Sequence, residues 1–290
     1  MPEHILSLSY GKDSLACLGA IEQLGWPLDR IVHAEVWATD TIPADLPPMV
    51  EFKSRADRII KERWGIEVEH IKSKYTFESG FYTLIGQRAK PEYRGKPRGW
   101  AGTVYGNWCN RDLKQPAFRA ANRQNGVYYI GIATDEPNRF RDLSDTKKSP
   151  LVEAGWTEAD CRRWCEENDL LSPIYTTATR GGCWFCHNQG VQQLRLLRKN
   201  YPEYWALMLK WDDDSPVTFK PGYRVTKQKT IINSDGEKET IFEDGEYIPG
   251  HTVHDFERRF QLEDDGIIYP DDRVFRWDML DSEMLNYRLF

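Results

Sequence analysis

The fold of this chain is decided by the stretch Leu6-Ser7-Leu8-Ser9-Tyr10-Gly11-Lys12-Asp13-Ser14-Leu15-Ala16. An apolar run from Ile5 to Leu8 is typical of a buried strand, and a polar turn that contains Gly11 follows it. Apolar residues then recur at helical spacing, at Leu15, Leu18, Ile21 and Leu24. The stretch therefore predicts a strand, a tight loop and the start of a helix.

The predicted helix start favours an anion, because the first backbone N–H groups of a helix lack partners and the helix dipole is positive there. Gly11 lets the backbone approach a phosphate closely. Ser9 and Ser14 can donate hydroxyl hydrogen bonds, and Lys12 adds a cation. Asp13 fits such a site if it orients the loop or helps to hold a cation. An ordinary helix start, with Asp13 or Ser14 as the N-cap, is the alternative.

Composition limits the class of protein. A chain of 290 residues suits one large or two small domains. Its net charge of −6 argues against a generally basic nucleic-acid-binding surface, although not against a local basic groove. We expect a cytoplasmic protein without a membrane segment, since the sequence has no long apolar run and no signal peptide. Six cysteines in such a chain favour metal binding or catalysis over disulfides.

Strand and helix patterns alternate after the first helix. We expect a second strand over residues 30–37, a helix over 46–64 and a third strand over 66–71. This alternation predicts parallel βαβ units in a doubly wound sheet, where ligands bind beyond the carboxyl ends of the strands. Asp40 follows the second strand, so it can accept a hydrogen bond from an adenine amino group or a ribose hydroxyl. A turn or helix cap is the alternative for Asp40.

Residues 72–106 combine basic and aromatic side chains, a composition that can bind nucleic acid through phosphate contacts and base stacking. A solvated loop with some packed aromatic side chains is the simpler account. Within this chain the segment is the best candidate for holding a large polyanion. Its basic residues are Lys72, Lys74, Arg88, Lys90, Arg94, Lys96 and Arg98.

The opening stretch resembles the PP-loop, Ser-x-Gly-x-Asp-Ser, of the adenine nucleotide alpha hydrolases, with Tyr10 where many members have glycine. Asp40-Thr41 resembles the phosphoadenosine phosphosulfate reductase branch of that superfamily. Two later segments resemble the same branch. They are Trp108-Cys109 through Leu113-Lys114, and Gly131 through Glu136 and Arg139, at the end of a strand expected over 127–133. The resemblance covers residues 1–210.

This resemblance implies a Rossmann-like, doubly wound and mostly parallel sheet over residues 1–210. A C-terminal α+β extension of unknown role, with a hairpin turn at Asn233–Gly236, is expected over 211–290. Ser9, Gly11, Lys12, Asp13 and Ser14 would hold phosphate, while Asp40 and Gly131 would flank the nucleoside. Lys114 and Arg139 would lie on the substrate side, with Arg141 beside Arg139, and the expected catalytic residues are Lys12, Asp13, Lys114 and Arg139.

The cysteine pattern indicates a metal centre. Cys183-x-x-Cys186 has the spacing of a metal-binding pair, and the resemblance places Cys109 near the nucleotide. Cys165, Cys161 or His187 can supply a fourth ligand, and we prefer Cys165. Cys161 lies one turn earlier in its helix, and His187 shares a tight turn with Cys186. A [4Fe–4S] cluster on Cys109, Cys165, Cys183 and Cys186 is our first hypothesis, a structural Zn²⁺ site the second and buried thiols the third.

The resemblance implies an enzyme that cleaves ATP, or a related adenine nucleotide, at the α-phosphate with Mg²⁺ and activates a substrate for sulfur transfer. A nucleic acid or a sulfur carrier is the expected partner, and a homodimer is one of the oligomeric states that we consider. A sulfonucleotide reductase is the second hypothesis, although no cysteine follows Cys186 to act as its nucleophile. A non-catalytic nucleotide-binding regulator is the third.

Overall fold

The computed structural model describes residues 2–102, 106–121, 126–140, 143–144, 146–176, 181–232, 238–270 and 277. The expected hairpin turn at Asn233–Gly236 and Arg141 lie outside these ranges. The chain divides into two compact units, which are described separately: the first spans Met1–Gly80 and Cys109–Cys186, the second Phe81–Trp108 and His187–Phe290. The domain boundary that the sequence predicts near residue 210 remains a prediction.

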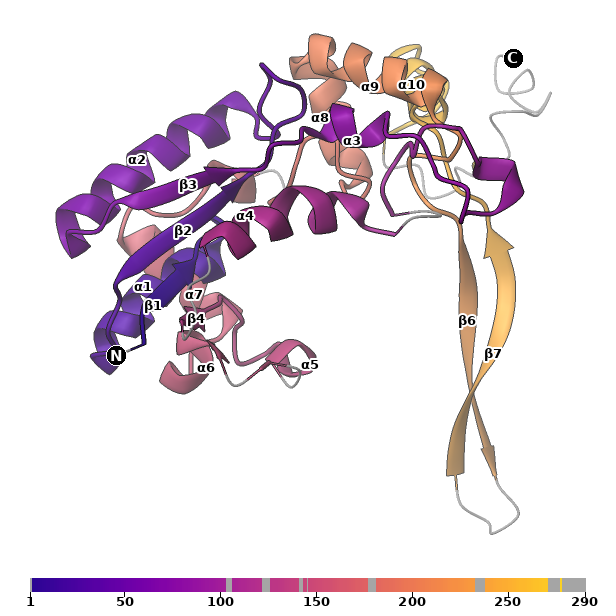
Figure 1. Cartoon of the computed structure of the whole chain (residues 1–290). Helices are drawn as coiled ribbons and strands as arrows, with labels where there is room; N and C mark the ends of the chain where they lie inside the picture. The colour runs from indigo at the N-terminus through magenta and orange to yellow at the C-terminus, as the bar shows by residue number, and fades with distance from the viewer. Residues whose placement is uncertain are drawn as a thin grey trace. The chain divides into compact units, whose positions relative to one another are not determined.

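A five-stranded parallel sheet forms the centre of the first unit, in the order β3-β2-β1-β4-β5 (Figure 1). Ile5 of β1 pairs with Arg30 of β2 on one side and with Tyr128 of β4 on the other. The strands are β1 (His4–Ser7), β2 (Arg30–Glu35), β3 (Val68–Lys72), β4 (Val127–Tyr129) and β5 (Lys147–Lys148). The expected α/β class and parallel sheet are confirmed, although β4 is shorter than the strand expected over 127–133.

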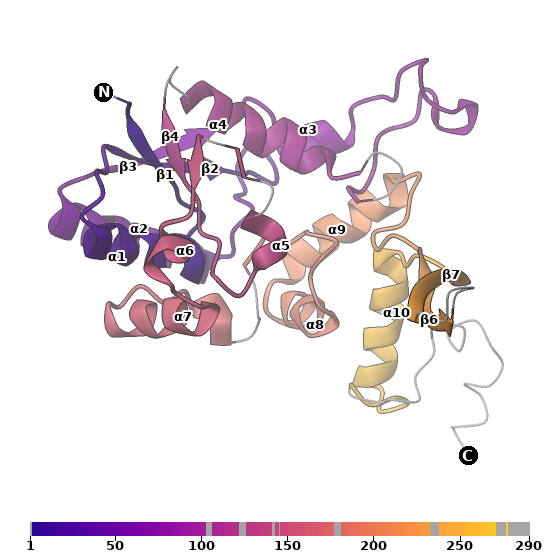
Figure 2. The same cartoon turned by 90° about the horizontal axis from the view of Figure 1, so that it is seen from below.

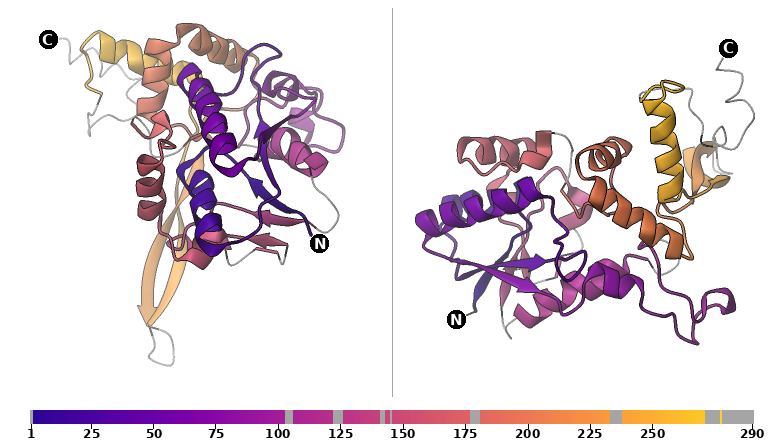
Figure 3. Two further views of the ribbon diagram at one scale, coloured as in Figure 1. Left: turned by 90° about the vertical axis from the view of Figure 1, so that its left-hand side faces the viewer. Right: turned by 90° about the horizontal axis from the view of Figure 1, so that it is seen from above.

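Helices cover both faces of this sheet, so the expected doubly wound arrangement is also confirmed (Figure 2 and Figure 3). One face packs against α1 (Lys12–Leu24), α2 (Pro47–Trp64), α6 (Pro150–Ala154) and α7 (Glu158–Glu167). The other face packs against α4 (Gln115–Ala121), whose Phe118 contacts Ile5 and Val32. The shorter elements of this unit are η2 (Asn110–Lys114), α5 (Pro137–Phe140), η3 (Pro173–Thr176) and the start of α3 (Phe77–Phe81).

The strand order creates a switch point beside β1. The chain first winds from β1 through β2 to β3, and it later returns to the other side of β1 with β4 and β5. In such sheets a crevice opens at the carboxyl ends of the two strands where the winding reverses, which are β1 and β4 here. The loop at residues 8–11 follows β1, so the fold puts it at this crevice.

The second unit contains η1 (Pro91–Tyr93), α8 (Val191–Asn200), α9 (Pro202–Asp214), the hairpin of β6 (Tyr223–Ile232) and β7 (Lys238–Ile248), and α10 (Val253–Asp264). Pro202 separates α8 from α9, as expected from a residue that is tolerated only at a helix start. The antiparallel pairing of β6 with β7 and the helix α10 confirm the expected C-terminal α+β extension. Arg198 of α8 pairs with Glu257 of α10, at 2.9 Å, and this pair joins the two helices.

No helix in the described ranges combines the length and the apolar composition that crossing a membrane requires.

Candidate functional site

The loop between β1 and α1 is anchored by Tyr10. This residue has φ = 57°, a left-handed conformation that glycine adopts more readily, and its ring is completely buried. Its hydroxyl donates a hydrogen bond to Asp57 and lies 3.1 Å from His70 Nε2. The positive φ gives a physical reason why glycine suits this position in the similar PP-loops, and the buried ring holds the loop in its place.

The two serines of the loop bond to each other at the start of α1. Ser14 Oγ accepts a hydrogen bond from Ser9 N–H (3.1 Å), lies 3.0 Å from Ser9 Oγ and donates to the Gly11 carbonyl (3.0 Å). Gly11 is the N-cap of α1, and it has no side chain with which to cap the helix. The alternative of an ordinary cap by Asp13 or Ser14 is therefore wrong. Lys12 N–H donates to the Tyr175 hydroxyl (3.0 Å), a contact that the sequence did not indicate.

Gly131 brings the end of β4 against the start of α1. A Cβ atom at this position would lie 2.6 Å from Ser14 N and 2.7 Å from the carbonyl carbon of Asp13, distances that side chains essentially never adopt. Only glycine therefore permits this approach. The residues expected to hold phosphate and the glycine expected to flank the nucleoside thus meet at the switch point.

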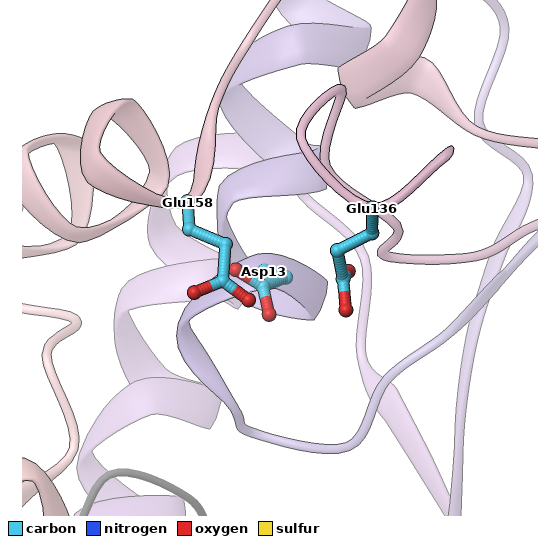
Figure 4. Close-up of side chains that lie close together, drawn as sticks. All are labelled: Asp13, Glu136 and Glu158. Carbon is cyan, nitrogen blue, oxygen red and sulfur yellow. The ribbon is translucent and has the colours of Figure 1, made fainter. Parts of the chain in front are cut away.

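Three carboxylates converge beside this contact (Figure 4). Asp13, Glu136 and Glu158 each place one oxygen within 4.8 Å of the others, the only such group of possible metal ligands among the described residues. Glu136 follows β4, within the motif that ends at Arg139. Glu158 begins α7, and nothing in the sequence pointed to it. Tertiary structure alone brings Glu158 to the loop.

Two cations pair with these carboxylates. Lys12 Nζ lies 2.7 Å from Asp13 Oδ1 and 3.3 Å from Glu158 Oε2. Burial by itself lowers the pKa of Lys12, but the hydrogen bond and charge of Asp13 outweigh it, so the pKa is raised and the amine is charged. Arg139 Nη1 lies 2.5 Å from Glu136 Oε1. Negative charge still exceeds positive charge here, so a phosphate fits this place when a further cation accompanies it.

Asp40 lies in the turn that follows β2, beyond the carboxyl end of that strand. Thr39 holds the turn, since its hydroxyl accepts a hydrogen bond from Ile42 N–H (3.1 Å). The Asp40 side chain is exposed and forms no hydrogen bond with any described residue. It is therefore available for a ligand.

The Cys183–Cys186 turn is held against the segment after β2. Cys186 N–H donates to the Cys183 carbonyl (3.0 Å) and closes the turn. Between them, Trp184 donates from its backbone N–H to the Ala44 carbonyl (3.0 Å) and from Nε1 to the Pro43 carbonyl (2.9 Å). Both Trp184 and Phe185 are buried. These contacts give the two thiols fixed positions.

Cys109 and Lys114 join this pair. Cys109 directly precedes the π-helical turn η2, an irregularity that is frequent at functional sites. Burial, with a smaller contribution from the neighbouring Cys186 and Cys109, raises the pKa of the Cys183 thiol to about 12, although the Lys114 ammonium opposes this shift. Burial and Cys186 likewise raise the pKa of Cys109, again opposed by Lys114. At neutral pH, Cys109 and Cys183 are therefore held as thiols unless a metal ion binds them.

Cys165, the expected fourth ligand, lies in a different cluster. Its Sγ donates to the Lys12 carbonyl (3.3 Å), and it is buried with Cys161 and Cys17 between α7 and α1. Among the described residues, Cys165 and the other three thiols do not form a group whose sulfur atoms all lie within 4.8 Å of one another, so Cys165 as the fourth ligand stays a prediction. His187, the alternative, packs against Gly102 of the second unit, where an added Cβ would lie 2.5 Å from His187 Nε2.

The remaining thiols do not form a tight metal site. Cys109, Cys183 and Cys186 do not have their sulfur atoms all within 4.8 Å of one another in the described structure. Thiolates on one zinc ion lie about 4 Å apart, given Zn–S bonds of about 2.3 Å.

The fold and the site together define a doubly wound α/β protein. Its first unit contains the loop with Gly11, a cluster of three carboxylates and the thiols of Cys109, Cys183 and Cys186. No model of a known protein family matches the chain, and no curated protein matches it either.

Proposed function

We propose that this chain is a PP-loop enzyme that cleaves ATP at the α-phosphate and activates a substrate oxygen for sulfur transfer, with nucleic acid as the substrate. One observation supports this most: the approach of Gly131 to the start of α1, at the switch point of the sheet. A helix start at such a place offers backbone N–H groups and a positive helix end to a phosphate.

The residues have distinct roles in this proposal. Ser9, Gly11 and Ser14 hold phosphate oxygens at the start of α1, and Asp40 and Gly131 flank the nucleoside. A substrate oxygen attacks the α-phosphorus, the bond to the β-phosphate oxygen breaks, and pyrophosphate leaves. A sulfur nucleophile then displaces AMP together with that oxygen. Lys12, Lys114 and Arg139 supply cations for the phosphate groups and the substrate.

Mg²⁺ fits the oxygen ligands of Asp13, Glu136 and Glu158, because it prefers carboxylates together with substrate phosphates. When bound there, magnesium neutralises charge on the pyrophosphate leaving group. The excess of negative charge beside the loop supports a requirement for the metal, since free ATP would be repelled by these carboxylates.

The three neighbouring thiols match an iron–sulfur cluster in ligand type but not in number. Cys109, Cys183 and Cys186 supply three of the four thiolates of a [4Fe–4S] cluster, and the fourth position stays open to another ligand. When bound, a cluster supplies electron or sulfur transfer. Zn²⁺ is the alternative, with a structural role.

The test is to incubate the anaerobically purified protein with ATP, Mg²⁺ and tRNA or duplex DNA, and to measure AMP and pyrophosphate. We expect both products, and we expect Asp13→Asn to lower their rate of formation and to weaken Mg²⁺-ATP binding by roughly 10- to 100-fold. Glu62→Gln is the matched control, since Glu62 is an exposed carboxylate on α2. Sulfite release from a sulfonucleotide would instead favour a reductase, and nucleotide binding without turnover would favour a regulator.

A further inference from the structure

The segment Leu84–Arg98, called the basic loop below, leaves and rejoins the second unit through a short ladder. Leu84 and Pro97 form an antiparallel bridge. Ile85 N–H donates to the Lys96 carbonyl (2.9 Å), and Gly95 N–H donates back to the Ile85 carbonyl (2.9 Å). The loop therefore has a defined stem.

The tip of the basic loop is also ordered. It contains the helical turn η1, where Tyr93 N–H donates to the Lys90 carbonyl (3.0 Å). Arg94 Nε donates to the Ala89 carbonyl (2.8 Å), so this guanidinium holds the tip together. Pro91 and Pro97 restrict the backbone further. The side chains on this tip are thus presented from a fixed backbone.

Three cations of this loop have no charged partner among the residues that the structure describes. Arg88, Lys90 and Lys96 are exposed, and their side chains form no ion pair or hydrogen bond with any described residue. Arg94 and Arg98 add two further cations, whereas Glu92 is the only acid in the segment. By contrast, Arg30, Arg195 and Arg198 each pair with carboxylates. In a chain with a net charge of −6, a local excess of this kind favours an anionic partner.

We infer that the basic loop binds the phosphodiester backbone of a nucleic acid. Fixed, unpaired cations at several points match a regular row of phosphates, and guanidinium groups bind phosphate with two parallel hydrogen bonds. Tyr93 in the tip and the exposed Leu84 in the stem add surface that can contact sugars and bases. The inference rests on the proposed function only for the role of the nucleic acid as substrate. Binding itself needs no ATP.

The experiment measures fluorescence anisotropy of labelled single-stranded DNA, duplex DNA and tRNA with the full chain, without ATP, over a range of salt concentrations. The test variant is Arg88→Gln/Lys90→Gln/Lys96→Gln, which keeps Arg94 and its structural hydrogen bond. The control variant is Arg58→Gln/Lys199→Gln/Lys210→Gln, which removes the same charge from exposed positions on α2, α8 and α9. The arm with the highest affinity identifies the type of nucleic acid.

We expect the test variant to lose about 10- to 100-fold in affinity near 0.1 M salt, and its log–log salt slope to fall by about two to three. The control variant is expected to stay within about twofold of the unchanged protein. Equal losses in both variants, or an unchanged slope in the test variant, would overturn the inference. So would equal competition by a poly-glutamate peptide.

Two measurements separate this inference from the proposed function. The test variant is expected to keep its circular dichroism spectrum and its affinity for Mg²⁺-ATP. Asp13→Asn is expected to bind nucleic acid as the unchanged protein does, because Asp13 lies in the other unit. Nucleic-acid binding without ATP cleavage would leave the basic loop established and the proposed reaction wrong.

Discussion

Gly131 is the single residue on which the geometry of the candidate site depends most. The absence of a side chain lets the segment after β4 approach Asp13 and Ser14 at the beginning of α1. Nothing about Gly131 itself is unusual in the sequence, and the motif that includes Glu136 and Arg139 is what marked it. The structure shows which atoms a side chain there would displace.

Gly131→Ala is expected to destabilise the protein by about 1–3 kcal/mol, because the new Cβ must push backbone atoms apart. Mg²⁺-ATP affinity is expected to fall as well, since the crevice changes shape. Urea denaturation and calorimetric titration measure the two effects. Gly86→Ala is the control, because a Cβ there meets nothing within 4 Å, and its effect is expected to stay within about 0.5 kcal/mol. Equal stability of the two variants would contradict the argument.

His70 links the buried Tyr10 to two carboxylates. Its Nε2 lies 2.9 Å from Asp57 Oδ2 and its Nδ1 lies 2.8 Å from Glu35 Oε1. The hydrogen bonds to Asp57 and Glu35 outweigh partial burial and raise the pKa of His70 to about 9. The hydrogen bond from His70 in turn lowers the pKa of Glu35 to about 2. A charged imidazolium therefore supports the loop near neutral pH.

This raised pKa predicts a pH dependence of stability. The folded state binds the proton more tightly than the unfolded chain, so the stabilisation is complete below pH 6.5 and is lost as the pH rises through about 9. Relative to His70→Gln, the unchanged protein is expected to lose about 1–2 kcal/mol over this window, allowing for solvent screening. Denaturation at several pH values measures it. His254→Gln, at an exposed pair in the second unit, is the control, and parallel curves for His70→Gln and the unchanged protein would contradict the prediction.

At the scale of elements, α7 shows how a local signal positions a distant group. Thr157 and Asp160 form the capping box that their spacing predicts: Thr157 Oγ1 accepts from Asp160 N–H (3.2 Å) and Asp160 Oδ2 accepts from Thr157 N–H (2.9 Å). The box fixes where α7 begins, and Glu158 is its first residue. The start of this helix therefore sets the position of one candidate magnesium ligand.

Thr157→Ala is expected to lower the free energy of unfolding by about 1 kcal/mol, because the cap of α7 is lost. It is also expected to reduce the extent to which Mg²⁺ strengthens ATP binding, because Glu158 loses its fixed position. Thr252→Ala removes the equivalent cap of α10 in the second unit, so it is the matched control. We expect a similar loss of stability from Thr252→Ala without any change in ATP binding. If the two variants bind Mg²⁺-ATP alike, Glu158 has no role in the site.

At the scale of the whole molecule, two separate segments of the chain build the first unit. The chain re-enters this unit at Cys109 and leaves it at Cys186. The second segment adds Cys109 with η2, the Cys183–Cys186 turn, and the strands β4 and β5 that complete the sheet. All three of these thiols therefore come from the second segment, while Pro43 and Ala44 of the first segment hold Trp184 between two of them.

This arrangement predicts which cysteines hold iron. Cys183→Ser and Cys109→Ser are expected to abolish iron, acid-labile sulfide and visible absorbance in anaerobically purified protein. Cys165→Ser is expected to keep them, as is the core variant Cys17→Ser. Loss of iron in Cys165→Ser would restore Cys165 as the fourth ligand. One zinc per chain without colour would make the site structural, and the absence of any metal would contradict both metal hypotheses.

The sequence by itself determined the features that depend on near neighbours in the chain. The strand–loop–helix start at residues 6–16 and the alternation that leads to a parallel sheet were both predicted from such features. Helical periodicity, helix caps and proline geometry act over a few residues, so a linear sequence displays them directly.

Only the tertiary structure decided which distant residues meet. It pairs β1 with β4 and so puts Gly131 on α1, it adds Glu158 and Tyr175 to the loop, and it packs Cys165 against the start of α1. The physical reason is that strand order and helix packing follow from burying apolar faces over the whole unit. Periodicity shows that a residue such as Cys165 lies on a buried helix face, but the strand order determines what that face contacts.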